Sequence, residues 1–225
     1  MILSISLIDE NDALAAIQRK LGKLEWRDGK ATAGVTARSV KANEQAVIST
    51  GTGKALSADI LTHLKDNVVL DAAARPRRFS PPMISRTRDG GHYGPHVDNA
   101  LMRVGDERLR TDLSYTLFLS AADSYDGGEL VIHDAGDARR LKGRAGELVL
   151  YPSGSVHEVT QVTRGERLVC VGWIESLIAD AAQRALLFDL ENLRATLRQS
   201  HSRQSAELVT LDKSIANLMR MWARP

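Results

Sequence analysis

The chain has 225 residues and a net charge of +2, which suits one domain with a smaller appendage and disfavours a nucleic-acid binder unless its basic residues cluster. Apolar residues make up 43% and charged residues 26%, enough for a globular protein with its own core. Cys170, the single cysteine, excludes an intrachain disulfide and a cysteine-rich metal site. The N-terminus lacks the basic start of a secretory signal, and no apolar run matches a membrane span, so we expect a cytoplasmic protein.

The pattern of residues 1–76 predicts an α/β segment. We expect this segment to pack on the core that residues 77–176 form. Residues 5–8 (ISLI) read as a strand, and Asp9 has the position of an N-cap for the following helix. A second helix is predicted over 57–69, where apolar residues recur on one side. GTGK at 51–54 lacks the full phosphate-loop pattern and is read as a mobile surface loop.

Residues 77–176 change to short apolar runs separated by turn sequences, which indicates an antiparallel β sandwich or barrel. The basic run RPRR at 75–78 is read as a solvated linker into this domain. TRGE at 163–166 is read as a tight turn between the last two strands. The predicted strands lie at 113–120, 129–134, 147–152, 156–160 and 167–174.

Residues 177–225 return to a helical pattern and are expected to form a C-terminal helical domain. One apolar stripe runs from Ala182 to Leu197 and another from Leu208 to Trp222. The stripes suit packing on the β domain or an interface between copies of the chain, so a homo-oligomer remains open.

Four histidines have ordinary explanations. His63 lies in a predicted helix without an acidic partner at matching spacing, and His201 lies in a polar segment. His133 precedes Asp134, but neighbouring strand residues face opposite ways, so this pair is expected to end a hairpin strand. His92 lies beside two glycines and is expected to fall off the strand.

GPHVD places His96 and Asp98 two residues apart. In an extended segment both side chains point to the same face, where they can hold one ion together. His157, from another predicted strand, supplies a third ligand. Two histidines and one carboxylate leave three positions open on an octahedral metal, as in non-haem iron oxygenases.

Arg167 lies on an otherwise apolar face of its predicted strand, where a guanidinium is costly without a counter-ion. Either the side chain reaches water at an edge, or it anchors a small acid beside the metal. Its distance of ten residues from His157 predicts that the two lie on adjacent antiparallel strands. A zinc hydrolase uses similar ligands but needs no such arginine.

The whole pattern resembles the Fe(II)- and 2-oxoglutarate-dependent dioxygenases, and within them the bacterial PKHD-type hydroxylases. The resemblance covers nearly the whole chain and is carried by YGPHVDNA, RTDLSYTLFLS, SYDGGELVIHD, GELVLYPSGSVHEVTQVTRGER and WIESLIADAAQRALLFDLE. It implies an α+β protein with a mainly β core, a double-stranded β-helix or jelly roll. N-terminal helices and a C-terminal helical appendage would flank this core.

The resemblance also implies a reaction and a role for each candidate residue. His96, Asp98 and His157 would bind Fe(II), and Arg167 would bind the distal carboxylate of 2-oxoglutarate. The enzyme would use O2 to hydroxylate a substrate, with release of succinate and CO2. L-Ascorbate would return oxidised iron to the ferrous state, and the family suggests a link to iron uptake.

One position departs from the family pattern. Related hydroxylases often carry a co-substrate tyrosine nine or ten residues before the first histidine, where this chain has Thr87 and Arg86. Thr87 offers a smaller hydroxyl, and Tyr93 and Tyr115 are the other candidates.

The expected substrate is a small molecule or a peptide, without a membrane partner. Nucleic acid is disfavoured, because Trp173 stands where repair dioxygenases usually place a second arginine. The alternative function is a non-redox jelly-roll module that binds a metal or ligand, which leaves Arg167 unexplained.

Overall fold

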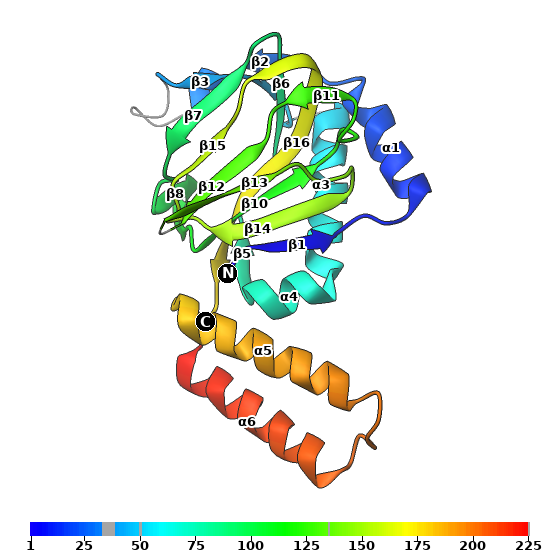
Figure 1. Cartoon of the computed structure of the whole chain (residues 1–225), viewed down its shortest axis with the longest axis vertical. Coiled ribbons are helices and arrows are strands. Elements are labelled where there is room, and N and C mark those ends of the chain that lie inside the picture. Colours follow the sequence, from blue (N-terminus) through cyan, green and yellow to red (C-terminus); the bar gives the residue numbers. More distant parts are fainter. Residues whose placement is uncertain (33–38, 50, 135, 225) are drawn as a thin grey trace.

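Two antiparallel sheets face each other and form a jelly roll in the computed structural model, which describes residues 1–32, 39–49, 51–134 and 136–224 (Figure 1). The major sheet is ordered β1 (Leu3–Ser6), β14 (Glu147–Pro152), β10 (Leu113–Phe118), β16 (Val162–Ser176), β6 (Met83–Arg88), β4 (Glu44–Ala46) and β2 (Trp26–Asp28). β16 also pairs with β11 (Tyr125–Gly127) and β5 (Pro76–Phe79).

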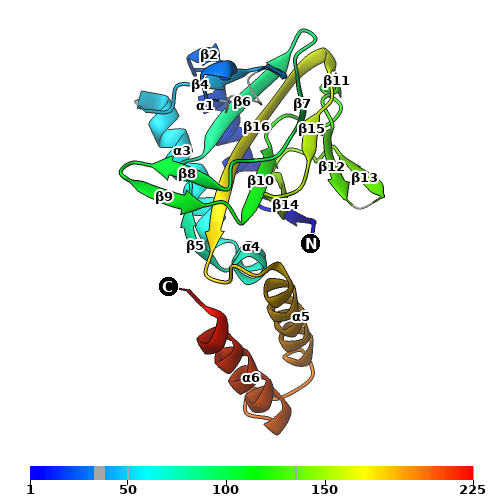
Figure 2. The ribbon, with the colours of Figure 1, turned by 90° about the vertical axis from the view of Figure 1, so that its left-hand side faces the viewer.

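The minor sheet is ordered β13 (Asp137–Leu141), β12 (Leu130–Asp134), β15 (His157–Val159), β7 (His92–His96) and β3 (Lys41–Ala42). A separate hairpin, β8 (Leu101–Val104) and β9 (Glu107–Arg110), follows β7 (Figure 2). The predicted mainly β core is therefore confirmed, with His133 and Asp134 at the end of the hairpin strand β12, as expected.

The strand β10 lies in the interior of the major sheet, between β14 and β16. All six of its residues are buried, because helices cover one face of the major sheet and the minor sheet covers the other. Tyr115 and Leu117 join the cluster under the helices, whereas Phe118 packs between the sheets against Leu130 and Val169. Polar and apolar residues from both sheets line a cavity between them.

The N-terminal helix begins one residue later than the sequence suggested. α1 spans Asn11–Leu21, and Glu10 occupies the N-cap position without a side-chain cap. Asp9 is unavailable as a cap, because its carboxylate accepts hydrogen bonds from the Ser6 hydroxyl and the Arg144 guanidinium. The first strand spans Leu3–Ser6, so it begins and ends two residues earlier than the predicted strand at 5–8.

The helix predicted over 57–69 is two helices, α3 (Gly51–Asp66) and α4 (Val68–Ala74), preceded by a short 3-10 helix at Gly29–Thr32. The boundary is set by Asn67, whose side chain accepts hydrogen bonds from the Val69 and Leu70 amides and so caps α4. The surface-loop interpretation of residues 51–54 was wrong, because they form the first turn of α3. At Gly53 a Cβ would lie 2.2 Å from the Val47 carbonyl oxygen, so the close approach requires glycine.

Two other interpretations of connecting segments were wrong. Residues 163–166 are not a turn but part of the long strand β16, where Gly165 has a positive φ and lies against β11. Residues 76–79 form the paired strand β5 rather than a solvated linker, since Arg77 and Arg78 both contact the Glu175 carboxylate on β16.

The C-terminal helices α5 (Ala181–Leu197) and α6 (Ala206–Trp222) form a hairpin that extends away from the β core (Figures 1 and 2). Their apolar stripes pack mainly on each other, in a cluster that contains Ile178, Leu187 and Ile215. The expected appendage is present, but its stripes do not lie on the β sheets.

Candidate active site

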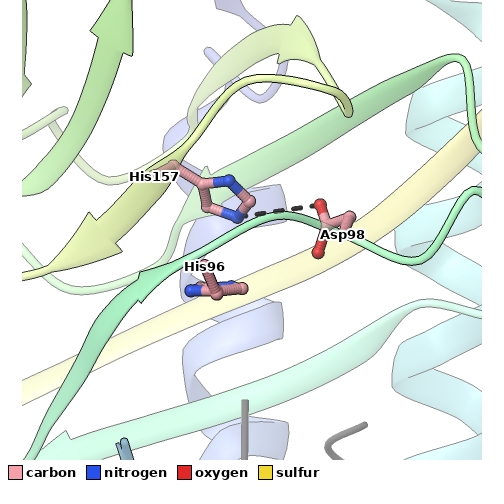
Figure 3. Close-up of side chains that lie close together, drawn as sticks. All are labelled: His96, Asp98 and His157. Atoms are coloured by element: carbon pink, nitrogen blue, oxygen red, sulfur yellow. Dashed lines mark ion pairs between the residues drawn. The ribbon is translucent and has the colours of Figure 1, made fainter. Parts of the chain in front are cut away.

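Three predicted metal ligands come together at one end of the jelly roll (Figure 3). His96 ends β7, Asp98 lies two residues beyond it, and His157 begins the neighbouring strand β15. His96 and His157 are register partners, and one ligand atom from each of the three side chains lies within 4.8 Å of the others. The Asp98 Oδ2 atom is 3.7 Å from the His157 Nε2 atom.

Backbone carbonyls fix which ring nitrogen faces the centre. The Nδ1 atom of His96 lies 2.8 Å from the Gly94 carbonyl oxygen, and that of His157 lies 3.0 Å from the Ser155 carbonyl oxygen. An Nδ1–H donated to each carbonyl leaves both Nε2 atoms with a free lone pair, which is the form that binds a metal.

Burial, reinforced by the nearby His157, lowers the pKa of His96 to about 4. The imidazole is therefore neutral at neutral pH and competent to bind a metal. Tyr93 stacks on this ring, with 3.7 Å between ring centroids. Burial and the Asp98 carboxylate raise the pKa of Tyr93 to about 12, so its hydroxyl stays protonated.

A cavity of about 470 Å³ opens beside the three ligands. Arg167 lies in its wall together with Val169, Val171 and Trp173, as the alternation along the strand predicted. Arg167 is on the major sheet, however, whereas His157 is on the minor sheet, so the prediction of adjacent strands was wrong. The two residues instead face the cavity from opposite sheets.

The Arg167 side chain does not reach water, since the residue is only 2% exposed. Its Nε atom has no hydrogen-bond partner among the described residues, and burial lowers the pKa of its guanidinium. Thr87 is its register partner on β6 and also lines the cavity. A buried cation in a cavity wall fits a carboxylate-bearing ligand, and the histidine and aspartate donors fit Fe(II).

Several lining residues escaped the sequence reasoning, among them Tyr151, Ser114 and Lys41. Tyr151 stands edge-on to His157, with 5.1 Å between ring centroids, and Ser114 donates a hydrogen bond to Asp98. Lys41 lies on β3, outside the segments that carried the motif. Strand parity offered a signal for Tyr151 and Ser114, but Lys41 enters through a long-range pairing that local sequence does not encode.

The remaining candidates lie outside this cluster. His133 pairs with Glu158 at 3.2 Å on the minor sheet, and Cys170 is buried in the core. His92 is exposed but begins β7, so the expectation that it falls off the strand was wrong. Tyr115 is fully buried and belongs to the cluster under the helices, although the residue also borders the cavity.

The fold and site define the class of 2-oxoglutarate- and Fe(II)-dependent oxygenases. Residues 82–175 match the model of the 2OG-Fe(II) oxygenase superfamily. An oxidoreductase of that family from Burkholderia pseudomallei has a TM-score of 0.54 and 19% identity, over 77% of this chain and 84% of that chain. A Trichoplax adhaerens prolyl hydroxylase, solved with a hypoxia-inducible-factor peptide, has a TM-score of 0.53 and 13% identity, over 82% and 86%.

Residues 181–224 match the model of the PKHD-type hydroxylase C-terminal domain. A PKHD-type hydroxylase from Hyphomonas neptunium is 51% identical, over 94% of this chain and 95% of that protein. One from Synechococcus elongatus is 44% identical, over 99% and 100%. The chain belongs to the PKHD-type hydroxylases.

Family membership confirms the predicted enzyme class, an Fe(II)- and 2-oxoglutarate-dependent hydroxylase, over the alternative of a non-redox binding module. The class uses Fe(II) as its metal cofactor and 2-oxoglutarate and O2 as co-substrates. Among the helices that the structure describes, none is long and apolar enough to cross a membrane.

Proposed function

We propose that His96, Asp98 and His157 hold the iron, and that Arg167 with Thr87 anchors the distal carboxylate of 2-oxoglutarate. The observation that carries the proposal is their convergence on one cavity, with the ligands and the buried guanidinium on opposite sheets. The product would be a hydroxylated small molecule or peptide, released with succinate and CO2.

Each side chain has a separate task. The two Nδ1–H hydrogen bonds orient the imidazoles, and Ser114 orients the Asp98 carboxylate. Arg167 fixes the direction of the co-substrate, because it is buried and lines the cavity from the sheet opposite to the metal ligands. Iron bound here would supply the centre at which O2 is activated and 2-oxoglutarate is decarboxylated.

The same proposal includes L-ascorbate as the reductant that keeps the metal ferrous, a cytoplasmic location and a link to iron uptake. These finer points are supported by the family resemblance and by the need for a reducing environment. We also propose domain boundaries near 76/77 and 176/177. The second is supported by the end of β16 at Ser176 and by the separate family matches on its two sides.

The direct experiment is 2-oxoglutarate turnover by the purified protein with Fe(II) and ascorbate, followed as succinate. Slow uncoupled turnover is expected from the wild type and none from Asp98→Ala. Asp126→Ala, which removes an exposed aspartate paired with Arg164, is the matched control and should retain activity. Turnover that survives Asp98→Ala would contradict the assignment of the metal site.

Arg167→Gln tests the second half of the proposal. The KM for 2-oxoglutarate should rise at least tenfold, while the Kd for Mn(II), an inert substitute for Fe(II), should change less than threefold. An equal loss of metal and co-substrate binding would mean that Arg167 supports the fold rather than the co-substrate.

A further inference from the structure

Tyr125, a residue outside the proposed site, packs beside Arg167 from a different strand. β11 pairs with β16 so that Tyr125 lies opposite Gly165, and Arg167 follows two residues further along β16. Both side chains pass over Gly128, where a Cβ would lie 2.9 Å from the Arg167 Cδ atom and 3.0 Å from the Tyr125 Cε2 atom. Their polar ends, the guanidinium and the phenol hydroxyl, are therefore neighbours.

Two buried polar atoms at this contact have no hydrogen-bond partner among the described residues. They are the Nε atom of Arg167 and the hydroxyl oxygen of Tyr125. Arg167 is 2% exposed and Tyr125 is 1% exposed, so bulk water does not supply the missing partners. A buried donor or acceptor without a partner is costly. Because the Nε–H group donates and the phenol oxygen accepts, each atom is a suitable partner for the other.

The Arg167 guanidinium has different neighbours on its different sides. Phe118 covers one face, with 5.5 Å between the Cζ atom and the ring centre. Arg167 lines the cavity, whereas Tyr125 does not, so the phenol approaches the guanidinium from outside the ligand space. An Nε–H group held by Tyr125 leaves both terminal nitrogens for a carboxylate, to which they can donate in parallel.

A phenol suits this position because it is neutral. Burial raises the pKa of Tyr125, and the Arg167 guanidinium opposes that rise only in part. The hydroxyl therefore stays protonated at neutral pH. A carboxylate in the same place would neutralise the guanidinium and compete with an incoming acid, whereas a neutral acceptor holds the Nε–H group and leaves the positive charge available.

We propose that Tyr125 is a positioning residue for Arg167, in which the hydroxyl oxygen accepts the Nε–H hydrogen bond and fixes the plane of the guanidinium for the distal carboxylate of 2-oxoglutarate. The inference rests on the proposed function, because it takes the role of Arg167 from it. Since the two atoms are not hydrogen-bonded in the structure, the pairing includes a small rotation of the arginine side chain. A guanidinium held in one orientation loses less freedom on binding, so the hydroxyl should contribute to co-substrate affinity.

The test compares the binding of two keto acids to the Mn(II)-loaded protein by calorimetric titration. 2-Oxovalerate chelates a metal as 2-oxoglutarate does, but it carries a methyl group in place of the distal carboxylate. Tyr125→Phe removes only the hydroxyl and should raise the Kd for 2-oxoglutarate about fivefold, the size expected for one hydrogen bond. The Kd for 2-oxovalerate and for Mn(II) should stay the same. With Fe(II), the KM for 2-oxoglutarate should rise in proportion, while kcat for uncoupled turnover is unchanged.

A double-mutant cycle shows whether the effect passes through the arginine. In the Arg167→Gln background, Tyr125→Phe should leave the Kd for 2-oxoglutarate unchanged, because the group that the hydroxyl positions is gone. Lys142→Met is the control for a merely structural effect. The Lys142 Nζ atom lies 4.2 Å from the centre of the Tyr125 ring and donates to the Tyr125 carbonyl oxygen, but the residue does not line the cavity. This variant keeps the hydroxyl and should bind 2-oxoglutarate as the wild type does.

The outcomes separate this inference from the proposed function. Wild-type affinity in Tyr125→Phe, an equal loss for 2-oxovalerate, additive losses in the double variant, or the same loss in Lys142→Met would each overturn the positioning role while Arg167 keeps its own. An unchanged Kd for 2-oxoglutarate in Arg167→Gln would instead contradict the proposed function, and the role of Tyr125 with it.

Discussion

Two buried hydroxyls hold the Asp98 carboxylate in place. Ser114 Oγ donates to Asp98 Oδ2 at 2.6 Å, and Ser153 Oγ lies 2.8 Å from Ser114 Oγ. Because Ser114 has one proton and gives it to the carboxylate, Ser153 must be the donor in the second bond. The carboxylate is thus oriented without a metal, which would lower the entropic cost of binding one.

At this scale we expect Ser114→Ala to weaken Mn(II) binding by about 10- to 100-fold, since supporting groups of metal ligands have effects of this size. Ser153→Ala keeps the direct donor to Asp98 and should cost less. Isothermal titration of both variants measures the difference. Wild-type affinity in Ser114→Ala would show that the hydroxyl pair has no role at the metal.

The lowered pKa of His96 predicts a pH dependence for the metal-free protein. The unfolded histidine takes up a proton near pH 6.5, whereas the folded one resists until about pH 4. The contribution of His96 to the free energy of unfolding is therefore fully present above pH 6.5. It should be lost as the pH drops from 6.5 towards 4. Urea unfolding should show a shallower fall in His96→Gln, and parallel curves would refute the contribution.

At the scale of elements, β16 organises the molecule because it contacts β10, β6, β11 and β5 along its length. Gly165 lets it continue where the sequence suggests a turn. Its φ is +75°, and a Cβ there would lie 2.2 Å from the Ser124 carbonyl oxygen. The strand is thereby held against β11, and Arg167 follows two residues later.

Gly165→Ala should lower the free energy of unfolding by about 1–3 kcal/mol, from backbone strain and the clash. Gly105→Ala shares a positive φ but has open space, so about 1 kcal/mol is expected. Gly154→Ala has neither problem and should be neutral. Urea midpoints for the three variants give the ranking, and equal values would contradict the role of close contact.

At the scale of the whole molecule, a polar joint attaches the C-terminal hairpin to the core. Ser176 Oγ donates to the Ala74 carbonyl at 2.6 Å, and the Leu177 amide donates to the Arg75 carbonyl at 2.7 Å. The buried Arg184 donates to the Ile178 and Ala179 carbonyls at 2.6 and 2.8 Å. The joint lies at the end of β16 opposite to Arg167, so it is separate from the active site.

Arg184→Met should destabilise the hairpin by about 1.5–3 kcal/mol, because carbonyls bonded to a buried charge lose their donor. Cleavage by a protease near residues 177–181 should become faster, while the Mn(II) affinity stays unchanged. Arg198→Met, at the exposed C-cap position just after α5, is the control. Metal affinity that falls in parallel with stability would refute the separation of joint and site.

Much of this molecule follows from local sequence, because strand and helix periodicity report which side chains share a face. That information was sufficient for the β core, the helical tail, the His96–Asp98–His157 set and the inward position of Arg167. Local periodicity failed where the conformation of a segment depends on pairing with a strand that is distant in sequence. Residues 163–166 read as a turn because glycine usually ends a strand, yet pairing with β11 carries β16 through them.

The sequence by itself determined the family and the residue types of the candidate site, since both are recorded in short motifs. Only the tertiary structure decided that Arg167 faces His157 across the cavity from the opposite sheet, and that Lys41 lines the same cavity. The physical reason is that the order of strands in a sheet depends on how much apolar surface the whole chain buries, and this is a sum over segments that are distant in sequence. No local window of residues contains that sum.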